Sequence, residues 1–437
     1  MGPAIESPRP KVFYGWVIVA VMAAVGALSM ALGTLNFGLF VKPMGDDLGI
    51  GRGIFGWAQS SRQFASAATS PMVGNLLDRF GARVLLTIAA ITTMVALIGL
   101  GFMYEGWHMI ALFGVMGLVG MSGPGALVTS VPVTKWFVKK RGKALSFTSL
   151  GVPIGGLIFV PLTQILIDGF GWRTAWIILA LLGGGLIIPL AILYVRREPE
   201  DMGLLPDGKA PEKVTSASDA DPRRSGHLVP VPDERSWTRE EALRSPTFWR
   251  LVVVFSMVML AISTVAIHRI PSFMDRGLNP QLISYATALD AAAAGMSTFA
   301  MGFLIRYVPA RFVGAGGFLM LTTASILTIL SDTHPMMFAS MICFGLGIGV
   351  LGLMQNYLWA EYFGRKHLGG IRGAVTPITL VFGGIGAPIS GYVRDATGTY
   401  NGVWIAAIVL MALGAVILSF TPPPPPPLVL EAVVDSV

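Results

Sequence analysis

The sequence predicts an all-α membrane protein with 12 transmembrane helices, arranged as two six-helix bundles that are related by a parallel pseudo-twofold repeat. Three observations lead to this prediction: an apolar composition, twelve long apolar stretches, and a repeat between the two halves of the chain. Of the 437 residues, 54% are hydrophobic and only 13% are charged, about half the charged share of a soluble domain. So much apolar side chain requires lipid as a solvent.

Twelve apolar stretches are each long enough to span a bilayer, which takes roughly 20 residues. The first is too long for the apolar core of a signal peptide, so we expect it to be retained. The expected spans are 14–38, 54–77, 84–103, 108–133, 143–167, 173–195, 248–270, 282–305, 312–331, 335–360, 371–393 and 402–420.

Basic side chains are distributed unevenly between the two sides of the predicted membrane. Most of the 31 Lys and Arg residues fall in the N-terminus, in the segment between the sixth and seventh stretches, and in the even-numbered loops. The positive-inside rule therefore predicts a plasma or inner membrane protein with both termini in the cytoplasm. The net charge of +7 reflects this topology and does not indicate a nucleic-acid partner.

Polar and proline-rich segments divide the chain into parts. The segment between the sixth and seventh stretches is rich in Pro, Asp, Lys and Ser, which predicts a solvated loop. Near its end, Thr238 and Glu241 have the spacing of a capping box and predict a short amphipathic helix. The expected parts are a cytoplasmic N-terminus at 1–13, an N-terminal bundle at 14–195, a cytoplasmic central loop at 196–247, a C-terminal bundle at 248–420 and a Pro-rich cytoplasmic tail at 421–437.

The two halves of the chain repeat, because five residues of the first half recur in the second at an almost constant offset. Each half holds six spans, so both halves run in the same direction through the membrane. Parallel repeats of this kind occur in secondary transporters whose substrate site lies near the membrane midplane, between the halves. The matching residues are Pro43 with Pro271, Gly49 with Gly277, Pro161 with Pro388, Asp168 with Asp395 and Gly171 with Gly398.

The loop between the second and third spans carries a charged motif, Gly74-Asn-Leu-Leu-Asp78-Arg79-Phe-Gly81-Ala-Arg83. The motif resembles the loop signature of the major facilitator superfamily. The resemblance implies a latch between the cytoplasmic ends of helices from opposite halves, with gating roles for Gly74, Asp78, Arg79 and Arg83. The alternative is that the arginines only anchor the loop at the membrane surface. The corresponding loop of the second half lacks the aspartate.

Three further segments resemble the monocarboxylate porter and oxalate–formate antiporter branch of that superfamily. The first, Tyr14-Gly-Trp16, opens the first span. The second runs from Lys135 to Ser146 and leads into a glycine-rich start of the fifth span. The third closes the seventh span, from His268-Arg-Ile-Pro to Asp-Arg-Gly277.

Charged residues inside the expected spans are candidates for function, because a charge in a membrane is energetically costly. Arg62 could bind an anionic substrate, or could be a structural arginine that extends to the interface. Asp290 could couple transport to protons, or could be a satisfied structural carboxylate. His268 and Arg269 could form an anion-attracting vestibule in which His268 exchanges protons, or could be interfacial anchors.

Polar residues in the helices that line the cavity of the resembled fold are further candidates. In that fold the first, fourth, seventh and tenth helices surround the substrate. Arg372, which starts the eleventh span, is expected to act as a cytoplasmic gate or an anchor. Hydrogen bonding between helices is the alternative for the cavity candidates. The expected substrate contacts are Asn36, Phe37, Gln355, Asn356 and Tyr357.

The sequence contains no motif for catalysis, a cofactor or a metal. It lacks a P-loop, a nucleophile elbow and a His/Glu metal spacing, and its single cysteine, Cys343, cannot form an internal disulfide. We therefore expect no enzyme activity, no cofactor and no metal. The expected partners are a small-molecule substrate, protons and membrane lipid, and we expect the protein to function as a monomer.

One function and two alternatives follow. We expect a secondary active transporter that moves a small organic anion, a carboxylate, by alternating access, as a proton symporter or an anion exchanger. Carboxylate carriers of the resembled branch use an arginine in the eighth helix, often with an aspartate one turn earlier, and some use a lysine in the first. Those positions are Thr298, Ala294 and Thr34 here. This departure favours the first alternative, a carrier or exporter of a neutral, zwitterionic or drug-like solute. The second alternative is a transporter-like membrane sensor.

Overall fold

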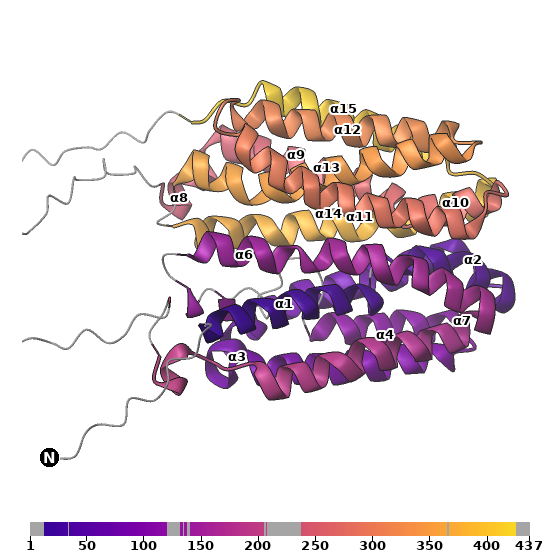
Figure 1. The fold of residues 1–437 in the computed structure, drawn as a ribbon. Helices are drawn as coiled ribbons and strands as arrows, with labels where there is room; N and C mark the ends of the chain where they lie inside the picture. The colour runs from indigo at the N-terminus through magenta and orange to yellow at the C-terminus, as the bar shows by residue number, and fades with distance from the viewer. Residues whose placement is uncertain are drawn as a thin grey trace, which may run out of the picture. The chain divides into compact units, whose positions relative to one another are not determined.

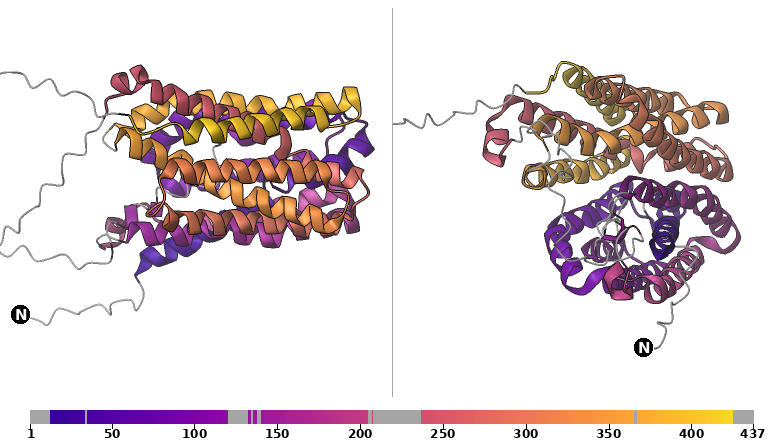
Figure 2. Two further views of the ribbon diagram at one scale, coloured as in Figure 1. Left: turned by 90° about the horizontal axis from the view of Figure 1, so that it is seen from above. Right: turned by 60° about the vertical axis from the view of Figure 1, so that its left-hand side comes forward.

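A computed structural model describes residues 13–33, 35–119, 132–133, 135–137, 140–204, 207, 237–364 and 367–424 of the chain (Figure 1). Regular secondary structure in these residues is entirely helical. The chain divides into two compact units. Unit 1 comprises Met1–Thr215 with Asn279–Ala292, and unit 2 comprises Ser216–Leu278 with Ala293–Val437. Within each unit the long helices run along a common direction (Figure 2).

Unit 1 begins with a broken helix. The first expected span forms α1, Tyr14–Ala31, and α2, Phe37–Leu48. Two very long helices follow, each containing two expected spans: α3, Arg52–Gly101, and α7, Gly151–Tyr194. Between them lie α4, Gly106–Leu118, and α6, Arg141–Ser149. A 3₁₀ turn at Pro199–Met202 comes after α7.

Glycine makes the sharp turn inside each of the two long helices. Gly81 in α3 has φ 77° and ψ 164°, and Gly171 in α7 has φ 76° and ψ 163°. Side chains with a Cβ rarely adopt such positive φ angles, so glycine is the residue that permits this turn. The two turns also share the sequence Asp-x-Phe-Gly-x-Arg, starting at Asp78 and at Asp168. Unit 1 therefore repeats within itself as well as matching unit 2, as in folds with nested repeats.

Unit 2 also contains a broken helix. The seventh expected span forms α9, Pro246–Ala266, and α10, Arg269–Asp275. The short helix α8, Arg239–Arg244, precedes it and has the predicted capping box, with both bonds between Thr238 and Glu241 present. The remaining helices are α11, Pro280–Leu304, which the unit boundary divides, α12, Ala310–Leu330, α13, His334–Phe363, α14, Leu368–Thr397, and α15, Asn401–Ser419.

The described helices coincide with all twelve predicted spans, the fourth in its first part only. Eight helical segments in the described residues are long and apolar enough to cross a membrane. Neither the first part of α3, which contains Arg62, nor α11, which contains Asp290, is among these eight. Both segments carry polar side chains that lower their mean hydropathy, which makes them unusual among the helices of this chain.

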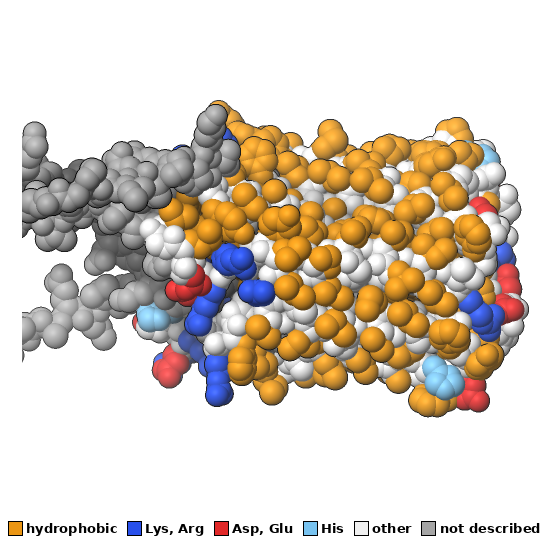
Figure 3. Space-filling view, turned by 60° about the horizontal axis from the view of Figure 1, so that its bottom comes forward, with side chains coloured by type: hydrophobic (Ala, Val, Ile, Leu, Met, Phe, Trp, Pro, Cys, Tyr) orange, Lys and Arg blue, Asp and Glu red, His pale blue; other side chains and the backbone are white. Residues whose placement is uncertain are grey.

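The surface of the molecule has the distribution of side chains that lipid requires. On the face drawn in Figure 3, hydrophobic side chains cover the middle, while Lys, Arg, Asp and Glu gather towards the two ends. Exposed apolar residues of α3, such as Ile88 and Val95, and of α7, such as Leu181 and Leu186, contribute to the apolar surface. Exposed apolar surface of this extent is a property of membrane-spanning proteins.

Glycines allow the backbones of neighbouring helices to approach closely in both units. In unit 1 a Cβ on Gly155 of α7 would collide with the backbone of Ala27 in α1. In unit 2 a Cβ on Gly386 of α14 would collide with the Oγ of Ser263 and the carbonyl of Leu260 in α9. Small residues at helix contacts are the usual means of tight association in a membrane.

Candidate functional site

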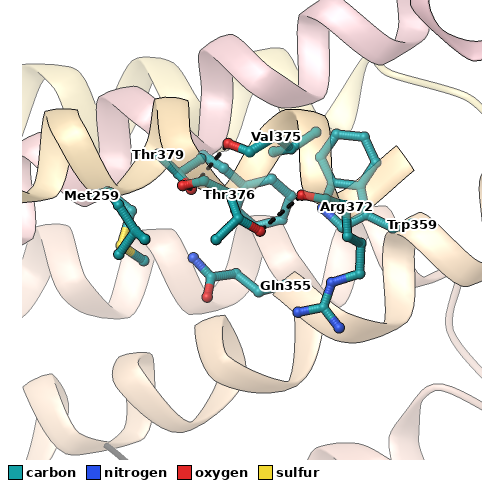
Figure 4. A pocket seen from close by; sticks show the side chains of 9 residues that line it. Met259, Gln355, Trp359, Arg372, Val375, Thr376 and Thr379 are labelled. Carbon is teal, nitrogen blue, oxygen red and sulfur yellow. Dashed lines mark hydrogen bonds between the residues drawn. The ribbon is translucent and has the colours of Figure 1, made fainter. Parts of the chain in front are cut away.

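A pocket of about 150 Å³ opens within unit 2, where α9, α13 and α14 meet (Figure 4). Each helix contributes side chains three or four positions apart, which lie on one face of a helix. Trp359 is buried, and the polar residues are concentrated on α13 and α14. The lining residues are Phe255 and Met259 from α9, Gln355 and Trp359 from α13, and Arg372, Val375, Thr376, Thr379 and Leu380 from α14.

The polar groups of the pocket differ in what they offer a ligand. The Oγ1 of Thr376 donates to the carbonyl of Arg372 at 2.8 Å, and the Oγ1 of Thr379 donates to the carbonyl of Thr376 at 3.0 Å. These hydroxyls therefore present lone pairs to the pocket. The Gln355 amide and the Arg372 guanidinium lie on the same side of the pocket (Figure 4). Arg372 supplies a permanent positive charge with several donors, and Gln355 supplies both a donor and an acceptor.

Of the three consecutive polar residues predicted in the tenth span, Gln355 alone lines this pocket. The Nδ2 of Asn356 donates to the carbonyl of Gly352 within its own helix at 2.9 Å. Tyr357 is 38% exposed and is not a lining residue. Adjacent residues of a helix point about 100° apart, so a cluster in sequence does not become a cluster on one face.

His268 and Arg269 are buried at the break between α9 and α10 and do not line the pocket. The Nε2 of His268 lies 2.8 Å from the carbonyl oxygen of Ala387 in α14, and its ring stacks on Tyr400. The guanidinium of Arg269 lies 3.9 Å from the ring centre of Phe344 in α13. Both side chains therefore join the broken seventh helix to its neighbours within unit 2.

The candidates of unit 1 lie near the break in the first helix and in α3. The Nδ2 of Asn36 donates to the Oγ1 of Thr163 at 2.8 Å. Phe37 is buried and packs against Phe113, with ring centres 4.5 Å apart. Arg62, the charged candidate of α3, is only 7% exposed.

Arg62 and Asp290 occupy equivalent positions in the two halves, because their separation in the sequence equals that of Pro43 and Pro271. Asp290 is only 4% exposed and belongs to the part of α11 that groups with unit 1. Two equivalent helices thus each carry one buried ionisable side chain, which is basic in α3 and acidic in α11.

The two arginines of the charged loop are exposed. Arg79 and Arg83 have exposed side chains, and the guanidinium of Arg79 lies 5.3 Å from the ring centre of Phe80. The stem of Arg197, which follows α7, packs over Gly81. The side chains of Asp78 and Gly74 are outside the described residues, so the latch stays a prediction.

Two of the segments that resemble the monocarboxylate porter branch, those beginning at Tyr14 and at Lys135, pack against each other in unit 1. The rings of Tyr14 and Trp136 lie 5.5 Å apart, and the hydroxyl of Tyr14 donates to the carbonyl of Tyr194 at 2.8 Å. The Nζ of Lys135 lies 2.7 Å from Oε1 of Glu198 and holds the pKa of that carboxyl below its usual value. Segments far apart in the sequence therefore form one cluster at the predicted cytoplasmic end.

Thr298 occupies the position at which carboxylate carriers of the resembled branch have an arginine. Here it forms a contact between two helices. The Oγ1 of Thr298 in α11 lies within donating distance of two carbonyl oxygens, that of Ala294 at 2.9 Å and that of Gly349 in α13 at 3.1 Å. A Cβ on Gly349 would collide with the α11 backbone. The cation in the unit 2 pocket is Arg372, which comes from α14.

Comparison with known proteins agrees with this architecture. A family model described as the Major Facilitator Superfamily matches residues 21–376 and 269–434. The chain belongs to the Major Facilitator Superfamily. It is therefore a multi-pass membrane transporter of small molecules and not an enzyme.

The relatives of this superfamily member agree with the branch indicated by the motifs. The chain is 22% identical to monocarboxylate transporter 13 of Bos taurus, over 96% of this chain and 92% of that protein. It is 23% identical to the oxalate:formate antiporter of Oxalobacter formigenes, over 80% and 79% of the two chains. A crystal structure of a bacterial homologue of the human lysosomal transporter Spinster has the same fold, with a TM-score of 0.66, 15% identity, and coverage of 94% of this chain and 96% of that one.

Proposed function

We propose that this transporter carries a small organic anion, a carboxylate, across the cell membrane by alternating access. The observation that supports this most is the pocket of unit 2, where Arg372 and Gln355 lie beside an apolar wall. A guanidinium binds a carboxylate through paired, charge-assisted hydrogen bonds. The carboxylate carriers named among the relatives support the same substrate class.

The roles of individual residues belong to this proposal. Arg372 binds the carboxylate and Gln355 orients it, in addition to the gating role expected for Arg372. Asp290 and His268 carry the proton in a symport cycle, or remain neutral partners in anion exchange. The protein acts as a monomer with both termini in the cytoplasm, and rocking of the two halves exposes the site to each side in turn.

Uptake into liposomes tests the proposal. Purified protein is reconstituted, and the uptake of labelled mono- and dicarboxylates is measured with and without an inward proton gradient. We expect Arg372→Ala to abolish saturable uptake of the transported acid and Arg372→Lys to raise its KM about tenfold, because a lysine cannot form the paired contact. Arg306→Ala is the matched control, since Arg306 is an exposed arginine at the end of α11. Normal uptake by Arg372→Ala would overturn the proposal.

A carrier of neutral or zwitterionic solutes is the second candidate, because Thr298 forms a helix contact where an anion-binding arginine is expected. The same liposomes distinguish the two candidates. Transport of a neutral compound without uptake or exchange of any acid would favour this second function.

A further inference from the structure

The short segment that leads into unit 2 contacts the two helix ends that carry the pocket. The backbone N–H of Trp237 donates to the carbonyl of Phe363, the last residue of α13, at 3.0 Å. The rings of Trp237 and Phe363 meet edge to face, with centres 5.7 Å apart. The segment that we call the strap, Trp237–Arg244, comprises Trp237, Thr238 and α8 (Figure 1).

An aromatic cluster connects the strap to the pocket wall. Phe363 stacks on Trp359, with ring centres 5.9 Å apart, and Phe248 packs against Trp359 at 5.5 Å. Trp359 also lies 6.2 Å from Phe255, and both Trp359 and Phe255 line the pocket. A close-packed interior transmits a displacement of one ring to the next, and these ring contacts run without a gap from Trp237 to the wall of the pocket.

The strap also contacts the start of α14, which carries the pocket cation. The stem of Arg239 lies about 3.9 Å from the Cβ position of Gly370, two residues before Arg372. The capping box of α8 fixes Glu241 beside Thr238, with 2.8 Å between Oε2 and the backbone nitrogen. That bond is the largest cause that lowers the pKa of Glu241, and the charge of His367, which precedes α14, lowers it further.

We infer that the strap is a positioning element for the pocket, with Trp237 holding the end of α13 and Arg239 the start of α14. The inference rests on the proposed function of that pocket. Movement of the strap shifts Trp359 and Arg372 relative to each other, and so changes the affinity of the pocket for its ligand.

A labelling experiment tests the strap without any knowledge of the substrate. Thr376→Cys is introduced into a Cys343→Ala background, and its reaction rate with a small anionic thiol reagent is measured in liposomes. We expect Trp237→Ala to increase this rate at least threefold, because the end of α13 loosens, and Trp237→Phe to restore the original rate. Trp107→Ala is the control, since Trp107 is an exposed tryptophan of α4 that donates to Glu105 and neither contacts the strap nor lines the pocket.

Transport kinetics supply the second measurement. We expect Trp237→Ala to raise KM for the transported acid about tenfold with less than a twofold change in maximal rate, whereas a general loss of folded protein would lower the maximal rate alone. If Trp237→Ala does not fold, Arg239→Ala serves as the second strap variant, because Arg239 is exposed and its loss should not unfold the protein. Arg239→Ala should raise KM about threefold. Arg244→Ala is its control. Unchanged labelling and unchanged KM in a folded strap variant would overturn the inference. If no acid is transported but labelling still changes, the proposed function fails and the strap stands.

Discussion

The helices α2 and α10 are equivalent in the two halves, yet different contacts hold them. Both follow a break in a helix, and each has an aspartate at its last or next-to-last residue, followed two residues later by a glycine with positive φ. Asp47 precedes Gly49, with φ 64°, and Asp275 precedes Gly277, with φ 79°. The two aspartates are separated in the sequence by the same interval as the two glycines.

In unit 1 a surface cluster around Asp47 contacts the end of α2. Arg173, just beyond the turn at Gly171, donates to Oδ2 of Asp47, and the Nε1 of Trp172 lies 3.2 Å from the same oxygen. The Arg173 hydrogen bond is the main reason that the pKa of Asp47 lies below its usual value. Both charged side chains are exposed, so the ion pair is screened by water.

In unit 2 the end of α10 is held by an ion pair of Asp275 and, in addition, by hydrogen bonds of Arg276. Asp275 pairs with Arg394 at 3.5 Å. Arg276, beside it, donates to the carbonyls of Thr328 at 2.7 Å and Ser331 at 2.9 Å, at the end of α12. A cation at a helix C-terminus satisfies carbonyls that have no partner within the helix. The position equivalent to Arg276 in unit 1 is Leu48, which cannot donate. We therefore expect α2 to separate from its bundle more readily than α10.

Replacement of Arg276 should cause a larger loss of stability than replacement of Asp47 or Asp275, and should remove the contact that distinguishes α10 from α2. Arg276→Ala should lower the free energy of unfolding by about 2 kcal/mol, because several charge-assisted hydrogen bonds to the end of α12 are lost. Arg276→Lys should recover less than half of this, since a lysine lacks the planar fork. Unfolding by denaturant in mixed micelles measures both. A loss no larger than that of the control Arg306→Ala would contradict the capping role.

Neutralising Asp47 and Asp275, one at a time, should cause an intermediate loss of stability and shows which of the two ion pairs contributes more. Asp275→Asn should lower the free energy of unfolding by about 1 kcal/mol, because its side chain is 20% exposed and that of Arg394 is 30% exposed. Asp47→Asn should have a smaller effect, because its pair is more exposed. Hydrogen exchange of α2 and α10 provides the second measurement: each substitution should speed exchange in its own helix. A larger loss from Asp47→Asn would reverse the proposed order.

The smallest expected effect is a dependence on pH in unit 1. The Arg173 hydrogen bond lowers the pKa of folded Asp47, so the folded protein binds fewer protons here than the unfolded chain. Its stabilisation is complete above the usual carboxylate pKa of about 3.9 and is lost as the pH falls through the lower folded value. Thermal unfolding midpoints of the wild type and Asp47→Asn should therefore differ at pH 7, and the difference should shrink as the pH falls below about 3.9. A constant difference across this range would show that Asp47 acts through something other than its charge.

Some of the candidate site was accessible to sequence reasoning and some was not. Gln355 was predicted as a substrate contact, whereas Arg372 was predicted as a gate or an anchor; both line one pocket in the structure. Thr376 and Thr379 were missed, although they follow Arg372 at helical spacing. Threonines in apolar helices commonly bond to their own backbone, as these two also do, so spacing alone does not distinguish a pocket from a helix contact.

The amino-acid sequence by itself determined the class of this protein. The long apolar stretches, the charge asymmetry and the repeat between the halves follow from hydrophobicity and periodicity, which can be read along the chain without knowledge of its contacts. Tertiary structure alone decided where the first and seventh helices break, which polar residues share the pocket, and that a strap at Trp237 contacts the ends of the two helices that carry most of it. These features depend on contacts between residues far apart in the sequence, such as Trp237 with Phe363 and Arg276 with Thr328, and packing of this kind leaves no periodic signal in either segment.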